Sequence, residues 1–475
     1  MSSRPARGEL AIVLHTHMPY VEGGAPWPRP ATELNPAGFG TWPFGEEWLW
    51  EAVATSYLPL LDVLGRAPIT LSLTPVLCDQ LEAPDALERC RRFFAELRPE
   101  SHRRDIERFR RAGRNGLAVE LERSSAEYLA AAEALARLDG GLLKAFGAHA
   151  TWTSSATHAV LPMLASDTGI ALQVQTGIAA HRRRFGAWSG GFWLPECGYG
   201  AWLDPLLEEA GVRQTCVELT RLFGRGDPRH LRPLATDDGP VLWPLDRDAM
   251  SLVWGEGGYP SRGAYRDYHR LTDYHHRPWR NDGRPYDPEA ARALAAEHAR
   301  DFVARVRERV RDGGVCVCAF DTELLGHWWY EGVQWLAAVV EQAAREDLRL
   351  TTLDHALDRH DPAPAPANLG VTSWGEGGDL RTWSGPVVAE IAWRVRSAEL
   401  RLLVSPRRPT ARALRELLAL QASDWAFLCS WDRAGEYPRE RVAAHAAALE
   451  RALAGDPGLE PGSRNLAPDL VGWAG

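Results

Sequence analysis

Short apolar runs that end in polar side chains alternate with stretches of helical periodicity along the chain. The apolar runs, which predict buried strands, cover residues 10–14, 69–73, 191–194 and 315–320. Residues 152–158 are expected at the polar end of a further strand, and helical spacing is found over 46–64, 202–210 and 333–346. This order of strand, polar strand end and helix is typical of a parallel sheet or barrel whose active site lies at the carboxyl ends of the strands.

The remaining segments differ in composition and predict the domain organisation. Residues 80–147 are rich in Ala, Leu, Arg and Glu with helical spacing and predict a helical insertion, whereas residues 221–300 are rich in loops. A Pro/Ala linker of extended character covers residues 361–368. We therefore expect a catalytic barrel over residues 1–360 and a C-terminal helical domain over residues 369–475 that contributes to the cleft.

Composition and charge argue against several classes of function. The 475 residues include 54 Lys and Arg against 63 Asp and Glu, and the net charge of -9 disfavours a nucleic-acid binder, which needs a basic face. No apolar stretch reaches the length of a membrane span and the N-terminus has no secretory signal, so no membrane partner is expected. Seven cysteines without a regular spacing favour a reducing compartment and a cytoplasmic location.

Two residue counts bear on the chemistry. The chain contains 20 tryptophans, and this excess suggests flat apolar faces on which sugar rings stack. Its only lysine is Lys144, so Schiff-base or pyridoxal chemistry would depend on a single residue. We therefore expect no cofactor.

Ionisable groups stand where the predicted strands end. Glu196 and Asp321 each follow an apolar run, Glu323 lies two residues beyond, and His15 and His17 follow the first run. Paired carboxylates in an aromatic-lined cleft suit glycoside hydrolysis, in which one carboxylate acts as nucleophile or base and the other, with a raised pKa, donates a proton. The alternative is that these carboxylates cap helices or pair with arginine.

Five segments resemble, in the same order, the signatures of glycoside hydrolase family 57 and, within it, of the α-1,4-glucan branching enzymes. They are LHTHMPYV (14–21), SSATHAVLPML (154–164), GFWLPECGYG (191–200), AFDTELLGHWWYEG (319–332) and SWGEGGDLRTW (373–383). Because the matches extend over nearly the whole chain, the resemblance is far more specific than any single segment would be.

The resemblance implies the fold and the reaction. The fold would be a distorted (β/α)7 barrel of class α/β, with helical insertions and a C-terminal α-helical domain. The mechanism would be retaining, with Glu196 as the nucleophile, Asp321 as the general acid/base and no metal. The expected activity is that of a 1,4-α-glucan branching enzyme on an α-glucan of the amylose or glycogen type. The alternatives are an α-amylase or 4-α-glucanotransferase, a catalytically silent glucan-binding protein and a metal-dependent deacetylase.

The resemblance, together with the aromatic residues beside the carboxylates, also assigns fifteen residues to substrate binding. They are His15, His17, His158, Trp193, Arg247, Asp248, Trp254, His327, Trp328, Trp374, Gly375, Asp379, Trp383, Asp424 and Trp425.

Several of these assignments have an alternative. His15, His17 and His158 can bind zinc together with a carboxylate, or His158 can be a satisfied core residue. Asp379 can cap the following turn instead of binding a hydroxyl. For Asp424 and Trp425 the alternative is helix packing.

One segment departs from the branching-enzyme pattern. Branching members carry a loop with a tyrosine at its tip that shields the intermediate, whereas the matching residues 222–248 contain no tyrosine and place Arg229 or His230 at the tip. This difference bears on whether transfer or hydrolysis prevails. The protein is expected to be a monomer or a homodimer.

Overall fold

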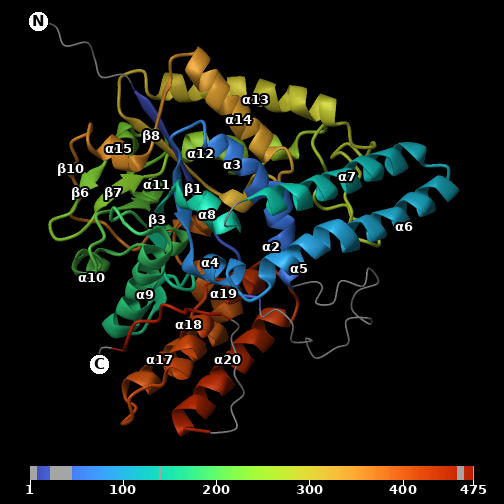
Figure 1. Cartoon of the computed structure of the whole chain (residues 1–475). Coiled ribbons are helices and arrows are strands. Elements are labelled where there is room, and N and C mark those ends of the chain that lie inside the picture. Colours follow the sequence, from blue (N-terminus) through green and yellow to red (C-terminus); the bar gives the residue numbers. More distant parts are fainter. Residues whose placement is uncertain (1–7, 22–44, 139–140, 457–464, 474–475) are drawn as a thin grey trace, which may run out of the picture.

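The computed structural model describes residues 8–21, 45–138, 141–456 and 465–473. Its centre is a curled sheet of parallel strands surrounded by helices (Figure 1). In the larger sheet the strand order is β4, β3, β2, β1, β8, and β9 also pairs with β1. The strands are β1 (Glu9–Thr16), β2 (Thr70–Leu73), β3 (Ala150–Ser154), β4 (Phe192–Trp193), β8 (Val315–Asp321) and β9 (Arg349–Thr351).

A smaller sheet completes the barrel. Its order is β10 (Ala363–Pro364), β6 (Leu234–Ala235), β7 (Val241–Pro244), β5 (Gln214–Val217). A parallel bridge between Gly191 and Gln214 joins the β4 side to β5, and the backbone N–H of Asp246, just after β7, donates to Val317 of β8 over 2.9 Å. The strands β1, β2, β3, β4, β5, β7 and β8 therefore follow one another in a ring, which confirms the distorted seven-stranded barrel.

Two strands of this ring were not predicted from the sequence. Both β5 and β7 have four residues, and β7 lies within residues 221–300, which were expected to be rich in loops. Neither strand offers a long apolar run, because β5 begins with Gln214 and β7 ends with Pro244. Pairing with each other and with their neighbours in the ring makes them strands.

Helices follow or precede most strands and cover the outside of the barrel (Figure 1). They include α4 (Pro75–Leu81), α9 (Asp167–Phe185), α10 (Asp204–Glu209), α12 (Arg247–Trp254), α13 (Pro288–Arg309), α14 (Gly332–Arg345) and α15 (Leu353–Leu357). The helix predicted over 46–64 is instead two α-helices, α2 (Glu46–Ala52) and α3 (Leu58–Leu64), joined by one π-helical turn, η1 (Val53–Tyr57). The wider turn packs closely against the loop after β8, where a Cβ added to Gly326 would lie 2.0 Å from the carbonyl oxygen of Thr55.

Residues 80–147 are mostly helical, as their spacing predicts. They form α5 (Ala86–Arg92), α6 (Arg98–Arg111), α7 (Asn115–Arg137) and α8 (Gly141–Gly147), and α6 and α7 project from the barrel as a pair (Figure 1). Buried polar contacts dock this pair onto the loops that follow α12. Arg266 pairs with Glu120 over 2.6 Å, and Asp105 is hydrogen-bonded to His276 over 2.8 Å.

The chain then passes to a bundle of helices beneath the barrel (Figure 1). The predicted linker is held at Ala363 and Ala365, whose N–H groups donate to the carbonyl oxygens of Pro233, just before strand β6, and Ala235, within it. Beyond it lie α16 (Arg381–Ser384), α17 (Ala389–Leu403), α18 (Ala411–Leu420), α19 (Asp424–Ser430) and α20 (Tyr437–Ala454). Their apolar core is continuous with residues of the barrel side such as Tyr20 and Leu172.

Two general features bear on the expectations from composition. The seven cysteines are all buried and unpaired. Across the described residues, no helix combines the length and the apolar character that crossing a membrane requires.

Candidate active site

The predicted carboxylates meet at the carboxyl ends of the barrel strands. Asp321 is the last residue of β8, and strand pairing places His15 of β1 directly beside it. Glu196 follows β4, and its charge contributes to the raised pKa of Asp321. The register of the barrel therefore places both carboxylates and the first predicted histidine in one site.

Glu196 adopts a backbone conformation that is rare for its residue type. Its φ of 61° and ψ of 19° lie in the left-handed region, which costs about 1–3 kcal/mol and is common at functional sites. Trp374 stabilises this conformation at two points. Its backbone N–H donates to the carbonyl oxygen of Glu196 over 2.9 Å, and its indole N–H donates to Oε2 over 2.8 Å. The segment before the C-terminal helices thus fixes the direction of the Glu196 carboxylate.

The surroundings of both carboxylates raise their pKa values. Burial raises the pKa of Glu196 to about 7, against the hydrogen bond from Trp374 that lowers it. Burial raises the pKa of Asp321 well above its usual range, and the negative charges of Glu196 and Glu323 raise it further. Both carboxyl groups therefore resist ionisation, and the charge of Glu196 opposes the ionisation of Asp321.

Glu323 is a third buried carboxylate that the site-residue assignment did not include. The hydroxyl of Tyr57, from the π-helical turn, and the backbone N–H of His17 both donate to its Oε1. Burial raises the pKa of Glu323 to about 7. The only sequence signal was its place two residues after Asp321. Its location between Tyr57 and His17 depends on the π-helical turn, which no pattern in the sequence predicts.

Four aromatic rings from three strand ends are stacked on one another in this site. Trp193 lies parallel to His15, with ring centres 4.8 Å apart, and His15 lies parallel to His158 at the same distance. His158 in turn stacks on His17 at 3.9 Å. The Nε2 atoms of His15 and His158 share a hydrogen bond of 2.8 Å, so the predicted histidines form one connected group.

The C-terminal helices hold two of these histidines. Ser423 Oγ lies 2.8 Å from His158 Nδ1, and Asp424 Oδ1 lies 2.9 Å from His17 Nε2. Burial lowers the pKa of His17, but the charge and hydrogen bond of Asp424 outweigh this effect and the pKa is raised overall. Asp424 and Ser423 thus position side chains of the barrel from the neighbouring helical region.

The hydrogen bonds among the histidines differ from those expected of metal-binding histidines. Burial lowers the pKa of His15 and His158 well below the usual range, and their shared hydrogen bond occupies one nitrogen of each ring. In the part of the chain that the structure describes, no group of three or more His, Cys, Asp or Glu side chains is arranged to hold a metal ion.

Among the buried polar atoms that lack a hydrogen-bond partner within the described residues, two belong to the histidines and Asp424 of this site. They are His15 Nδ1 and Asp424 Oδ2. Buried polar atoms are almost always satisfied in folded proteins, so these two atoms are available to a ligand or to an ordered water. A ligand rich in hydroxyl groups can donate to or accept from both atoms.

Arg247 and Trp254 lie with Trp374 at the edge of the site. The Arg247 guanidinium pairs with Glu218 over 2.7 Å and donates to the carbonyl oxygen of Trp374. Trp254 is 40% exposed, and its ring centre lies 6.4 Å from that of Trp374. Arg247 therefore supports the segment that positions Glu196, whereas Trp254 offers an open aromatic face.

The remaining predicted residues lie in varied surroundings. His327 and Trp328 are partly exposed in the loop after β8, and Gly375 is partly buried where a Cβ would lie 2.8 Å from the Trp383 ring. Asp248 is paired with Arg225 over 3.1 Å. Their contact with a glucan stays a prediction.

Four other predicted substrate contacts are buried or paired within the protein. Trp425 is fully buried among the C-terminal helices and donates its indole N–H to Ala419 over 2.8 Å, and Trp193 and Trp383 are also buried. Asp379 pairs with Arg381 and caps the following turn, because Oδ1 accepts from the Arg381 N–H over 3.0 Å. The contacts of Trp425 and Asp379 match the packing and capping alternatives, and contact of any of the four with a glucan stays a prediction.

The segment expected to carry the shielding tip is compact. His230 is buried, with Nε2 lying 3.1 Å from the carbonyl oxygen of Gly224. Arg229 is exposed but lies over the ring of Phe223 and pairs with Asp227. His230 therefore does not form an exposed tip, and Arg229 is engaged within its own turn.

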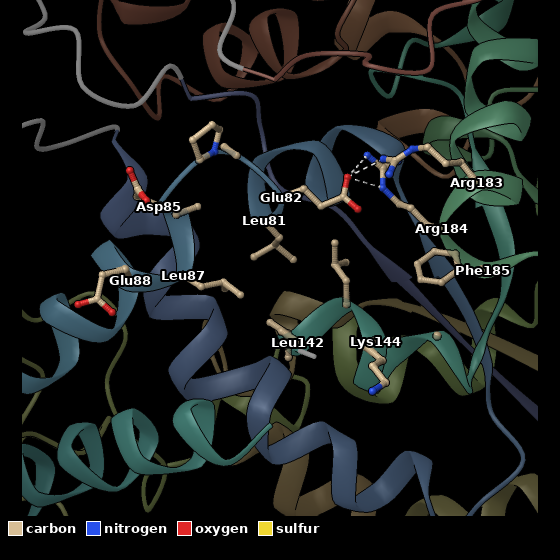
Figure 2. A pocket seen from close by; sticks show the side chains of 16 residues that line it. Leu81, Glu82, Asp85, Leu87, Glu88, Leu142, Lys144, Arg183, Arg184 and Phe185 are labelled. Carbon is tan, nitrogen blue, oxygen red and sulfur yellow. Dashed lines mark hydrogen bonds and ion pairs between the residues drawn. The ribbon is translucent and has the colours of Figure 1, made fainter. Parts of the chain in front are cut away.

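A surface pocket of about 780 Å³ lies elsewhere, between the loop after α4, helix α8 and the end of α9 (Figure 2). Its charged side chains are paired with one another, since Glu82 contacts Arg183 over 2.6 Å and Arg184 over 2.8 Å. None of the predicted site residues lines this pocket.

Comparisons with known proteins agree with this geometry. The model of glycosyl hydrolase family 57 matches residues 147–365, and a model of the C-terminal region of 1,4-α-glucan branching enzymes matches residues 398–455. A 1,4-α-glucan branching enzyme of Thermococcus kodakarensis is 30% identical over 94% of this chain and 73% of its own length. A probable 1,4-α-glucan branching enzyme of Mycobacterium tuberculosis is 31% identical over 99% of this chain and 96% of its own.

A solved structure is similar over the same extent. The branching enzyme of Pyrococcus horikoshii has a TM-score of 0.83 and 32% identity, covering 94% of this chain and 89% of that one. The resemblance found in the five sequence segments is confirmed, and the chain belongs to glycosyl hydrolase family 57.

Proposed function

We propose that this protein is a retaining 1,4-α-glucan branching enzyme, which cleaves an α-1,4 linkage and forms an α-1,6 linkage through a covalent glucosyl-enzyme. The observation that carries this proposal is the pair of buried carboxylates, Glu196 and Asp321, brought together in a chain whose full-length relatives are branching enzymes. The branched product would be a storage glucan of the glycogen type, made in the cytoplasm.

The reaction proceeds in two displacements. In the first, Glu196 attacks the anomeric carbon and forms a glycosyl ester, while Asp321 gives its proton to the departing 4-oxygen. In the second, Asp321 takes a proton from the 6-hydroxyl of an acceptor chain, whose oxygen displaces Glu196. The carboxylates of such a pair lie about 5–5.5 Å apart in retaining enzymes.

The electrostatics support these roles. The nucleophile must be ionised and the acid protonated in the same molecule, so the acid needs the higher pKa. Glu196 has a pKa of about 7, and that of Asp321 lies well above its usual range. The left-handed conformation of Glu196, secured by Trp374, directs the nucleophile before substrate binds.

Product analysis tests this function. Amylose is incubated with the protein and with Glu196→Gln as the control, while proton NMR counts α-1,6 linkages and a reducing-end assay counts hydrolysis in the same tube. We expect new α-1,6 linkages with few new reducing ends. Reducing ends alone would identify a hydrolase and point to residues 222–248, which lack the tyrosine. If neither signal appears, plain α-1,4-glucans are excluded as the substrate.

The dependence of kcat/KM on pH follows from the two raised pKa values. Activity requires ionised Glu196 and protonated Asp321, so kcat/KM falls as the pH decreases through about 7 and falls again as the pH rises through the raised pKa of Asp321. We expect a bell-shaped profile whose acidic limb lies near pH 7, measured as initial rates on soluble amylose. An acidic limb near pH 4 would contradict the buried environment of Glu196.

Glu323→Gln is expected to shift the alkaline limb of that profile to lower pH. The negative charge of Glu323 raises the pKa of Asp321, so a neutral side chain lets Asp321 lose its proton earlier. The amide oxygen of Gln can still accept from Tyr57 and His17, which keeps the geometry. A matched control is Glu376→Gln on the exposed turn before α16. An unchanged alkaline limb in Glu323→Gln would show that Glu323 does not tune Asp321.

A further inference from the structure

Helix α19 carries two exposed aromatic side chains on the face that begins at the active site. Phe427 is 38% exposed, and Trp431, which follows the last helical residue, is 46% exposed. Asp424, Phe427 and Trp431 are spaced by three and four residues, so they share one face of the helix. The N–H of Trp431 donates to the carbonyl oxygen of Phe427 over 3.2 Å, so this geometry extends to Trp431.

The rest of the helix is buried. Trp425 and Cys429 belong to the apolar core of the C-terminal helices, and Leu428 is buried as well, so α19 as a whole is not a surface helix. Leaving a tryptophan and a phenylalanine partly in water on an otherwise buried helix forgoes favourable burial. Exposed aromatic side chains that gather on one face are typical of a surface that binds a ligand.

This face is continuous with the active site. At one end, Asp424 contacts His17, and the preceding Ser423 contacts His158. Further along, Ser430 Oγ donates to the carbonyl oxygen of Thr382 in α16 over 2.5 Å. Helix α16 directly follows the segment of Trp374, which positions Glu196. The contact of Ser430 with α16 therefore places α19 alongside that segment. From residue 424 to residue 431 the helix rises about 10 Å, a distance that a short run of glucose units covers.

We propose that Phe427 and Trp431 form a platform that binds an α-1,4-glucan chain where it extends beyond the active site. The inference rests on the proposed function and adds a subsite that selects long chains. The apolar faces of glucose rings stack on aromatic rings, while their hydroxyl groups stay in water. A branching enzyme must hold a long chain during two displacements, and such a platform retains it without contacting the reacting carbon.

A double variant of the full chain, Phe427→Ala with Trp431→Ala, tests the platform against Trp393→Ala as the control. Trp393 lies on α17 and is 69% exposed, so this control removes an exposed indole from a different helix. Affinity electrophoresis in gels containing amylose measures binding, and initial rates on amylose and on maltotetraose measure turnover. We expect the double variant to lose retardation in the gel. We also expect the ratio of kcat/KM on amylose to that on maltotetraose to fall about tenfold, from two lost stacking contacts.

The outcomes separate the platform from the proposed function. If the wild type is retarded by amylose but forms no α-1,6 linkages, branching is contradicted. The platform is still supported in that case, provided that the double variant migrates freely. Equal retardation of the wild type and the double variant would overturn the platform. So would a loss of retardation in Trp393→Ala as large as that in the double variant. A dimer that becomes a monomer in the double variant, measured by light scattering, would show instead that a second copy covers this face. Trp431→Gln alone repeats the test if the double variant unfolds.

Discussion

Glu196→Gln is expected to lower kcat on amylose by at least about 10⁴-fold without unfolding the protein. An amide does not form the glycosyl ester, so the first displacement stops. The glutamine has nearly the same shape, and its side-chain oxygen can still accept the hydrogen bond from the indole of Trp374. The loss is therefore chemical, and circular dichroism should be unchanged. If Glu196→Gln keeps more than a hundredth of the wild-type rate in a preparation free of wild-type protein, Glu196 is not the nucleophile.

A glycine at the same position makes the test more specific. Glycine adopts the left-handed conformation of residue 196 without strain, so Glu196→Gly removes the carboxylate and leaves the backbone undisturbed. With α-maltosyl fluoride as substrate, azide can enter from the vacated side and displace fluoride in one step. We expect β-maltosyl azide as the product, identified by its anomeric proton. The α-anomer would mean that a nucleophile still acts on that face.

The strand ends of the site could be predicted from the sequence, because apolar runs identify buried strands and the chemistry follows directly after them. The run before Asp321 becomes β8, and the run before His15 becomes β1. Pairing in register then brings the two residues side by side. The sequence supplied the family as well, through segments that coincide with these strand ends.

The local geometry of the site could not be predicted in this way. The left-handed conformation of Glu196 goes against the ordinary tendency of glutamate and is stabilised by Trp374, which is 178 residues away. The π-helical turn that brings Tyr57 to Glu323 depends on its packing against Gly326 after β8. Both features arise from tertiary contacts, and no local sequence pattern marks them.

Aromatic residues were the least predictable part of the site. Trp425 and Trp254 both resemble ligand-stacking residues in the sequence, yet Trp425 is fully buried and Trp254 is 40% exposed. A tryptophan contributes a large apolar surface in either place, so composition does not separate the two uses. Phe427 and Trp431 were not assigned at all, because their shared face matters only once Asp424 is known to contact His17.

Asp321→Asn is expected to lower kcat on amylose by about 10²–10⁴-fold, because no proton reaches the departing 4-oxygen. The loss should be much smaller in the first turnover of α-maltosyl fluoride, since fluoride departs without protonation. The glycosyl ester on Glu196 would then accumulate, because no base activates the acceptor. Stopped-flow release of fluoride should show a burst equal to the enzyme concentration. A steady rate without a burst would contradict the role of Asp321 in the second displacement.

Asp321→Ala completes the comparison with Glu196→Gly. Azide needs no base, so it should attack the glycosyl ester on the face opposite Glu196, give α-maltosyl azide and accelerate turnover. Opposite anomers from the two variants identify Glu196 as the nucleophile, whereas the same anomer from both would contradict the pairing of roles. The rescued variant should also lose the alkaline limb of its pH profile, because that limb reports the proton of Asp321. If the alkaline limb persists, the proton donor is Glu323 instead, the other buried carboxyl group whose charge acts on Asp321.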